Sequence, residues 1–209
     1  DAGGQGQLPE TRRLAEAVLA ELERSGVSAI PVKGPTLAAL VYRDLSLRLY
    51  EDLDVLIARR DREKAEAALA TLGYRTLSTF DDDRDSLLAE SHHEAFAHSE
   101  SGTPLELHWS LTHKTLARDH LEELWWSDTQ PVELGGVTLA TLGVEPLVLY
   151  LCMHGAKHSW SRIGWLCDLH RTLERFDGVQ WSSVWRMARE RGAVRAVTVG
   201  VRLVTQLLD

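Results

Sequence analysis

The N-terminal part of the chain carries apolar residues at helical spacing. Leu14, Val18 and Leu22 recur every four positions within residues 9–24, which predicts a helix with one apolar face. Gly26 follows this stripe, and we expect it to end the helix because glycine readily adopts the left-handed conformation found at helix C-termini. The folded part of the chain is therefore expected to begin with an amphipathic helix.

Period-two patterns follow this helix and predict strands. Residues 27–32 form a short apolar run. Leu53, Val55 and Ile57 alternate with Asp52, Asp54 and Leu56, so both segments are expected to be strands. Residues 80–90 are acid-rich and irregular, and we expect a loop there. The other expected elements are a helix beginning at Pro35, a helix at 61–72, a strand at 74–77, a hairpin with arms at 93–98 and 103–109, and a smaller hairpin that turns at Gly135-Gly136.

Beyond residue 142 the pattern becomes helical throughout. We therefore expect an α+β domain at residues 8–142 and a helical domain at residues 143–209. Because the last helical pattern runs to the end of the chain, we expect the helical domain to be truncated there. The four expected helices of this domain lie at 146–160, 164–175, 182–191 and 194–208.

Composition and charge restrict the classes of function. The apolar share of 44% and the charged share of 26% are those of ordinary globular proteins. A total of 31 acidic residues against 23 Lys and Arg gives a net charge of -8, which argues against a broad nucleic-acid-binding surface. No run approaches the roughly 18 apolar residues of a membrane span, and residues 1–7 lack the apolar core of a signal peptide. We therefore expect a cytoplasmic protein that binds neither membrane nor nucleic acid.

Two acids on one expected strand and a third acid on another indicate a metal site. Asp52 and Asp54 are two positions apart, so both side chains project from the same face of a strand. Glu106 and His108 share the face of the 103–109 strand that is opposite its apolar residues. If the two strands are neighbours, three carboxylates converge as oxygen ligands suited to Mg²⁺. A solvated strand edge is the alternative, because strand pairing is not visible in the sequence.

Four motifs, in sequence order, resemble a known family. They are Val32-Lys33-Gly34-Pro35 with Leu47-Arg48, then Asp52-Leu53-Asp54-Val55-Leu56, then Leu105-Glu106-Leu107-His108-Trp109, and finally Leu151-Cys152-Met153-His154-Gly155-Ala156-Lys157-His158 with Trp165-Leu166-Cys167-Asp168-Leu169. Over roughly residues 8–175 the chain is similar to the "uncharacterised nucleotidyltransferase" family of the polymerase-β-like superfamily. The resemblance implies an α+β fold, with a small mixed sheet and helices, followed by a helical region.

The resemblance also implies a reaction. In that superfamily a hydroxyl or similar acceptor attacks the α-phosphate of a nucleoside triphosphate, and pyrophosphate leaves. By resemblance, Asp52 and Asp54 bind two Mg²⁺ ions, and Glu106 binds the catalytic ion and assists deprotonation of the acceptor. The chain is therefore expected to be a Mg²⁺-dependent nucleotidyltransferase that uses ATP or another nucleoside triphosphate.

A phosphate-binding turn is expected after the first strand. The superfamily usually has Gly-Gly or Gly-Ser at this turn, whereas this chain has Gly34-Pro35, and proline has no N–H to offer a phosphate. Gly34 still permits close backbone approach, and the Thr36 hydroxyl is near the start of a helix, where anions are favoured. Because Lys33 and Arg48 add positive charge, we expect Lys33, Gly34, Thr36 and Arg48 to contact the nucleotide.

A second polar cluster lies in the expected helical domain. His154, Lys157, His158 and Ser161 have the spacing of one helical face, and Arg162 is next to them. We expect Lys157, His158 and Arg162 to bind phosphate or the acceptor, because Lys and Arg pair with phosphate oxygens. A solvated helix face is the alternative.

Histidine spacing leaves a zinc site open. His154 and His158 are four positions apart on a helix and can hold Zn²⁺ together with a further ligand. The metalloprotease pattern requires Glu after the first His, and Gly155 occupies that position. Candidates for the further ligand are His92, His93, His98 and His108.

Three classes of function fit the sequence. The first is transfer of a nucleoside monophosphate to a small molecule, such as an antibiotic-like amino-alcohol or sugar. The second is transfer to a protein, a peptide or an RNA end, and the acidic balance weighs against RNA. The third is a non-catalytic nucleotide-binding domain, which the departures at Gly34-Pro35 and Glu51 favour.

Overall fold

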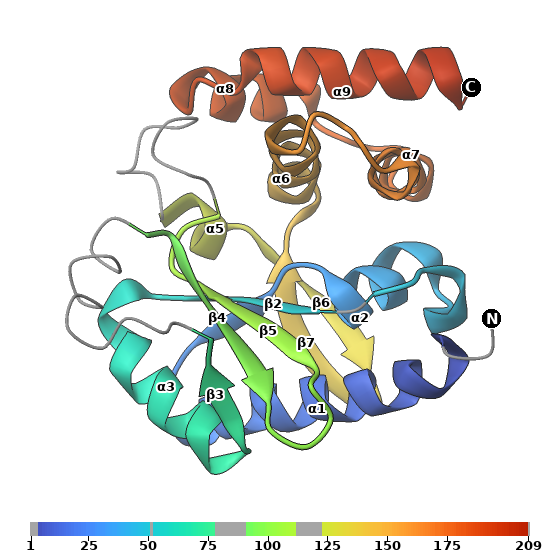
Figure 1. The fold of residues 1–209 in the computed structure, drawn as a ribbon. Coiled ribbons are helices and arrows are strands. Elements are labelled where there is room, and N and C mark those ends of the chain that lie inside the picture. The colour runs from blue at the N-terminus through green and yellow to red at the C-terminus, as the bar shows by residue number, and fades with distance from the viewer. Residues whose placement is uncertain (1–3, 51, 78–90, 112–122, 209) are drawn as a thin grey trace. The chain divides into compact units, whose positions relative to one another are not determined.

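The computed structural model describes residues 4–50, 52–77, 91–111 and 123–208 (Figure 1). Glu51 and the acid-rich segment 80–90, for which the sequence predicts a loop, lie outside the described residues. Contacts within the chain divide it into two compact units. The first unit comprises residues 1–111 and 131–141, and the second comprises residues 112–130 and 142–209.

A five-stranded mixed sheet forms the centre of the first unit. Its strand order is β1-β2-β5-β4-β3, with β2 and β5 parallel and the other neighbours antiparallel. The strands expected from period-two patterns are all present, and the 93–109 hairpin is confirmed. The bounds are β1 Ala29–Pro31, β2 Leu53–Ile57, β3 Tyr74–Thr76, β4 His93–His98 and β5 Pro104–His108.

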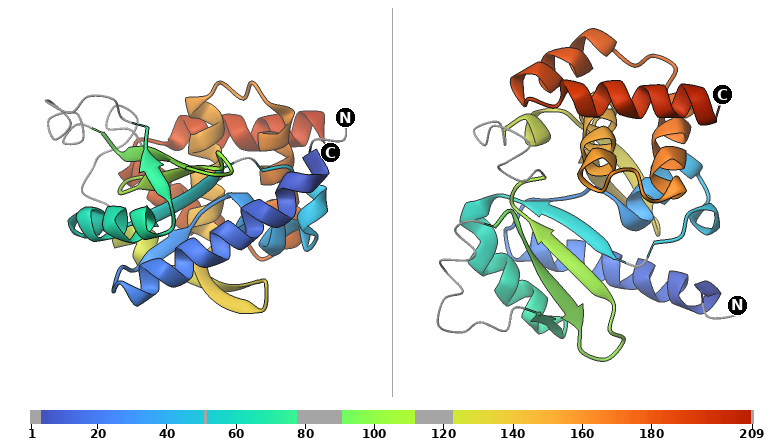
Figure 2. Two further views of the ribbon diagram at one scale, coloured as in Figure 1. Left: turned by 60° about the horizontal axis from the view of Figure 1, so that its bottom comes forward. Right: turned by 45° about the horizontal axis from the view of Figure 1, so that its top comes forward.

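Two helices cover one face of this sheet. Figures 1 and 2 show α1 (Gly4–Arg24) and α3 (Arg62–Thr71) on the same side of the strands. Apolar residues of both helices share a buried core with Leu53, Val55 and Ile57 of β2. Because side chains alternate along a strand, Asp54 projects from the face opposite α1 and α3.

The segment that joins β1 to β2 is irregular. The helix predicted from Pro35 is a short α-helix, α2 (Gly34–Leu37), which continues directly as a π-helical turn, η1 (Ala38–Tyr42). Arg43 ends this turn in the left-handed conformation, with φ of 57°. A 3-10 turn, η2 (Leu45–Leu47), then leads toward β2, and another, η3 (Arg59–Asp61), connects β2 to α3.

A two-stranded hairpin follows α5 (Glu123–Ser127). Its strands are β6 (Thr129–Leu134) and β7 (Val137–Leu142), and they turn at Gly135-Gly136, as predicted. Both glycines have positive φ, 60° and 85°, which favours glycine at these positions.

Four further helices belong to the second unit. They are α6 (Val144–Lys157), α7 (Ile163–Arg175), α8 (Trp181–Glu190) and α9 (Val194–Leu207), which confirms the four helices predicted there. Among the helices of the described residues, none combines the length and the hydropathy that a membrane span needs.

The predicted extension of α6 to residue 160 is wrong. Ser159 and Trp160 both have φ of 53°, and their N–H groups donate to Ala156 O at 3.1 Å and to Gly155 O at 2.8 Å. This pair of hydrogen bonds is the Schellman pattern, which ends a helix. The prediction failed because Ser159 stands where glycine usually marks such an end.

Candidate active site

Strands β2 and β5 bring two of the predicted acids side by side. They are parallel neighbours, and their register pairs Asp54 with Glu106 and Leu56 with His108. The sequence did not determine whether these two strands are neighbours, and the structure shows that they are. Since apolar residues of both strands pack into the core, the polar residues share the opposite face.

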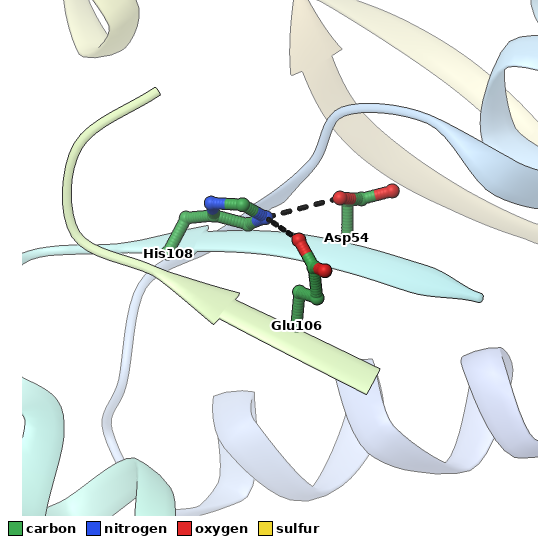
Figure 3. Close-up of side chains that lie close together, drawn as sticks. All are labelled: Asp54, Glu106 and His108. Carbon is green, nitrogen blue, oxygen red and sulfur yellow. Dashed lines mark hydrogen bonds and ion pairs between the residues drawn. The ribbon is translucent and has the colours of Figure 1, made fainter. Parts of the chain in front are cut away.

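The side chain of His108 joins the two carboxylates (Figure 3). Its Nε2 lies 3.0 Å from Asp54 Oδ1 and 3.2 Å from Glu106 Oε2. On the other side of Asp54, Lys33 Nζ lies 3.0 Å from Oδ2. The Asp54 side chain is fully buried, so these two partners supply the positive charge that a buried carboxylate requires.

The proton equilibria of this group follow from burial and charge. Burial alone raises the pKa of Asp54, but the charge of Lys33 and the hydrogen bond from His108 outweigh it and hold that pKa well below its usual range. The hydrogen bond from His108 lowers the pKa of Glu106 to about 2. Burial lowers the pKa of His108, but its bonds to the two carboxylates outweigh burial and raise it. Hydrogen bonding within this group therefore favours the charged form of each of its three side chains.

Asp52 stands just before β2 and is half-buried. Its pKa is raised, first by burial and then by the nearby charge of Asp54, and the charge of Lys33 acts in the opposite direction. Asp54, Glu106 and His108 each offer a ligand atom, and these atoms all lie within 4.8 Å of one another. Asp52 is not part of that close group, although it lies near enough for its charge to interact with the other two acids.

The Gly34 turn lies directly against the acidic strand. Gly34 has φ of 61°, and a Cβ at this position would be 2.9 Å from the carbonyl oxygen of Asp52. Arg48 donates from Nη1 to Gly34 O at 3.4 Å, and Lys33 immediately precedes the turn. Thr36 is buried, with 1% of its surface exposed. The turn therefore places Lys33 beside the Asp54 carboxylate and Arg48 beside the Gly34 carbonyl, and the contact of either with a nucleotide stays a prediction.

Two further histidines lie beside His108, and the sequence analysis considered them only as zinc ligands. His93 pairs with His108 across β4 and β5, and the two rings are stacked with centroids 5.2 Å apart. The His92 ring lies 4.4 Å from that of His93. Counting outward from the predicted turn at residues 99–102 would have paired His93 with His108, so the hairpin pattern contained this signal.

The second polar cluster belongs to the helical unit. The ring centroids of His154 and His158 are 4.8 Å apart. The centroid of the Trp165 ring lies 5.3 Å from that of His154 and 5.0 Å from that of His158. The Arg162 guanidinium lies 5.9 Å from the Trp165 ring centroid, and Lys157 is exposed at the last position of α6. Ser161 does not share the helical face predicted for it, because α6 ends before it.

The zinc alternative gains no support from the described residues. In the described ranges, the only group of three or more His, Cys, Asp or Glu side chains placed to hold a metal ion is Asp54, Glu106 and His108. His154 and His158 are not part of it. The side chains that could bind a metal ion therefore lie on strands β2 and β5.

Comparison with known proteins identifies the family. The sequence profile of the "uncharacterised nucleotidyltransferase" family matches residues 8–209. The chain therefore belongs to this family, as its motifs indicated. No curated protein sequence matches it significantly.

Solved structures with the same fold include an antibiotic-resistance factor. The crystal structure of ANT(2'')-Ia in complex with adenylyl-2''-tobramycin has a TM-score of 0.58 at 12% identity, covering 85% of this chain and 95% of that one. Its solution structure has a TM-score of 0.57 at 11% identity, covering 87% and 95%. An antigenic nucleotidyltransferase-like protein from Paracoccidioides brasiliensis has a TM-score of 0.51 at 14% identity, covering 93% and 94%. The predicted α+β, polymerase-β-like nucleotidyltransferase fold is thus confirmed.

Proposed function

We propose that this protein is a metal-dependent nucleotidyltransferase that moves a nucleoside monophosphate from a nucleoside triphosphate to a hydroxyl group of a small molecule. The observation that carries the proposal is the group of Asp54, Glu106, His108 and Lys33, in which Asp54 and His108 are buried, in a chain of this family. In the reaction the acceptor oxygen forms a bond to the α-phosphorus. The bond from that phosphorus to the bridging oxygen breaks, and pyrophosphate leaves.

The residues present fit a divalent metal ion. Carboxylates held this close together repel one another unless cations compensate them, and a divalent ion would add to the positive charge that Lys33 and His108 bring. Asp52, Asp54 and Glu106 would hold Mg²⁺, with two ions as the proposed number. When bound, such ions neutralise the charge of the triphosphate and favour both attack and departure of oxygen.

The Gly34 turn is the proposed binding site of the triphosphate. Because Gly34 lacks a Cβ, the turn packs directly on the backbone of Asp52, and a phosphate bound at the turn would lie beside the acidic strand. Lys33 and Arg48 bring positive charge to this turn, and Thr36 adds a hydroxyl. These four residues are the proposed nucleotide contacts.

Glu106 is the acid best placed to meet the acceptor. Its side chain is 37% exposed, whereas that of Asp54 is fully buried. We therefore propose that Asp54 serves in metal binding and that Glu106, on the acceptor side, would receive the hydroxyl proton. Lys157, His158 and Arg162 of the helical unit are proposed to bind phosphate or the acceptor.

The acceptor class is proposed from the fold. ANT(2'')-Ia, which shares this fold, was solved with adenylyl-2''-tobramycin, an adenylyl group joined to a small molecule. A cationic amino-alcohol or amino-sugar also suits a chain whose net charge is -8. We therefore rank small-molecule acceptors ahead of a protein, a peptide or RNA.

Calorimetry and pyrophosphate release test this proposal. ATP, GTP, CTP and UTP are titrated with Mg²⁺ present into the wild type, Asp54→Asn, and a matched control, Asp177→Asn, which alters an exposed acid between α7 and α8. We expect at least tenfold weaker binding of the preferred nucleotide to Asp54→Asn and no change in the control. Pyrophosphate release is then measured with a panel of amino-alcohols. Equal release by wild type and Asp54→Asn would rule out the proposed site.

A further inference from the structure

The candidate metal-binding group, Asp54, Glu106 and His108, is not made of carboxylates alone. It offers one oxygen from Asp54, one oxygen from Glu106 and the ring nitrogen Nε2 of His108. The three side chains come from neighbouring strands and meet on the same face of the sheet (Figure 3). A ring nitrogen thus stands among the acidic ligands.

The spacing of these atoms suits a common metal ion. Two ligands at right angles around an ion, each bonded at about 2.1 Å, lie about 3.0 Å apart. The Nε2 atom of His108 lies 3.0 Å from Asp54 Oδ1 and 3.2 Å from Glu106 Oε2. Both separations, which are hydrogen-bond distances, also match adjacent positions in one coordination shell, in which a metal ion would take the place of the Nε2 proton.

The position of His108 is fixed by its surroundings. It is the last residue of β5, its side chain is 8% exposed, and the ring of His93 stacks on it. Asp54 is held equally firmly, because its side chain is fully buried in the middle of β2. A ligand set carried by two paired strands is rigid, and rigid sets discriminate between ions by donor type.

We infer that His108 is a nitrogen ligand of the catalytic metal, and that it gives this protein a preference for a divalent first-row transition ion over Mg²⁺. The inference rests on the proposed function, but it departs from the Mg²⁺ proposed there as the preferred ion. Mg²⁺ takes oxygen ligands and keeps its water, whereas imidazole suits transition ions. A ligand set of two carboxylates and one imidazole therefore favours a transition ion over Mg²⁺.

Electron spin-echo spectroscopy with Mn²⁺ tests this inference directly. Purified protein is loaded with Mn²⁺, and the spin-echo modulation is recorded for coupling to ¹⁴N. We expect ¹⁴N coupling in the wild type and none in His108→Gln, which replaces the ring nitrogen with an amide group. His93→Gln is the matched control, since it removes the stacked ring but none of the three ligand atoms, and its coupling should persist.

Metal titration gives a second readout. Mn²⁺ and Mg²⁺ are each titrated calorimetrically, and we expect the ratio of their affinities to fall at least tenfold in His108→Gln, mainly through weaker Mn²⁺ binding. Thermal unfolding checks that the variant is folded. An unchanged ratio in a folded variant, wild-type Mn²⁺ binding without ¹⁴N coupling, or no Mn²⁺ binding at all would each overturn the inference.

Pyrophosphate release separates this inference from the proposed function. Metal-dependent release without ¹⁴N coupling would reject His108 as a ligand and leave the proposed function intact. Coupling without nucleotide binding or release would support the nitrogen ligand and count against the proposed function.

Discussion

Gly34 occupies a position where a side chain has no room. Its φ of 61° is unfavourable for other residues, and a Cβ would approach the Asp52 carbonyl oxygen to 2.9 Å. The contact links the turn after β1 to the residue that precedes β2. The lack of a side chain at Gly34 therefore sets how closely the proposed phosphate turn and the acidic strand approach one another.

We predict that Gly34→Ala destabilises the protein and weakens nucleotide binding. The left-handed conformation alone costs about 1–2 kcal/mol, and the contact with Asp52 adds to it. The matched control is Gly26→Ala, which has φ of 70° but nothing within 4 Å of its Cβ. Urea unfolding should show a larger loss for Gly34→Ala, and only this variant should bind the nucleotide more weakly. Equal losses of stability would refute the steric argument.

The electrostatics of single residues explain why the acids can be buried. Asp54 has Lys33 on one oxygen and His108 on the other, so neither oxygen lacks a cationic partner. The sequence suggested Lys33 as a phosphate contact but gave no indication that it pairs with Asp54. A pairing between a turn residue and a strand residue depends on how the chain folds back, which periodicity does not encode.

At the scale of elements, local patterns predicted most of the fold. The alternation of β2, the turn of the β4–β5 hairpin and the double glycine of β6–β7 each depend on neighbouring residues, and each was predicted correctly. The parallel pairing of β2 with β5 was not predictable, because it joins segments far apart in the chain. The candidate site depends on that pairing, and so the sequence named its residues but not their contacts.

The end of α6 shows how a missing glycine misleads prediction. Trp160 follows the end of the helix, and its ring packs against Gly155 and Gly200. A Cβ would lie 2.3 Å from the nearest atom of this ring at Gly155 and 2.9 Å from it at Gly200. Gly155 is in α6 and Gly200 is in α9. Both glycines therefore leave space for an indole ring, a role that a helical spacing rule does not detect.

We predict that Gly200→Ala destabilises the helical unit. Its Cβ would lie 2.9 Å from the Trp160 ring and 3.1 Å from Cys152 Sγ, and overpacking of this kind costs about 1–3 kcal/mol. The control is Gly164→Ala in α7, where nothing lies within 4 Å of the Cβ, so alanine should stabilise the helix by up to about 1 kcal/mol. Opposite shifts of the urea midpoint are expected. A stabilised Gly200→Ala would show that the indole ring moves freely.

At the scale of the whole molecule, the two units interleave along the sequence. Residues 123–130, which the sequence analysis put in the α+β part, lie with the helical unit. Gly143 N donates to Asp128 O at 2.8 Å, and Gln130 Nε2 donates to Leu142 O at 2.9 Å. The bonds tie the two ends of the hairpin to each other. Composition along the chain marks where helices begin, whereas contacts decide which unit a segment joins.

The stability of the molecule should fall in acid, partly through the candidate site. The folded pKa of Glu106, about 2, lies below the ordinary value near 4.3, so its ionised form adds stability above the ordinary value. This contribution is lost as pH falls from about 5 toward 2. We predict that urea unfolding at pH 7, 5 and 3 shows a smaller acid loss for Glu106→Gln than for the wild type. Parallel curves would contradict the pKa assignment.

The parallel pairing of β2 and β5 also has a consequence for folding kinetics. Asp54 and His108 are 54 positions apart in the sequence. Strands β3 and β4 lie between β2 and β5 in the chain, so they are synthesised before β5 can pair with β2. Such a pairing pays the entropy of closing a long loop, so it belongs to the later steps of folding. During synthesis on the ribosome, the emerging chain would gain its cation-binding group only once β5 has joined the sheet. A metal ion would then bind only after the sheet has formed, so metal binding would not initiate assembly of the sheet.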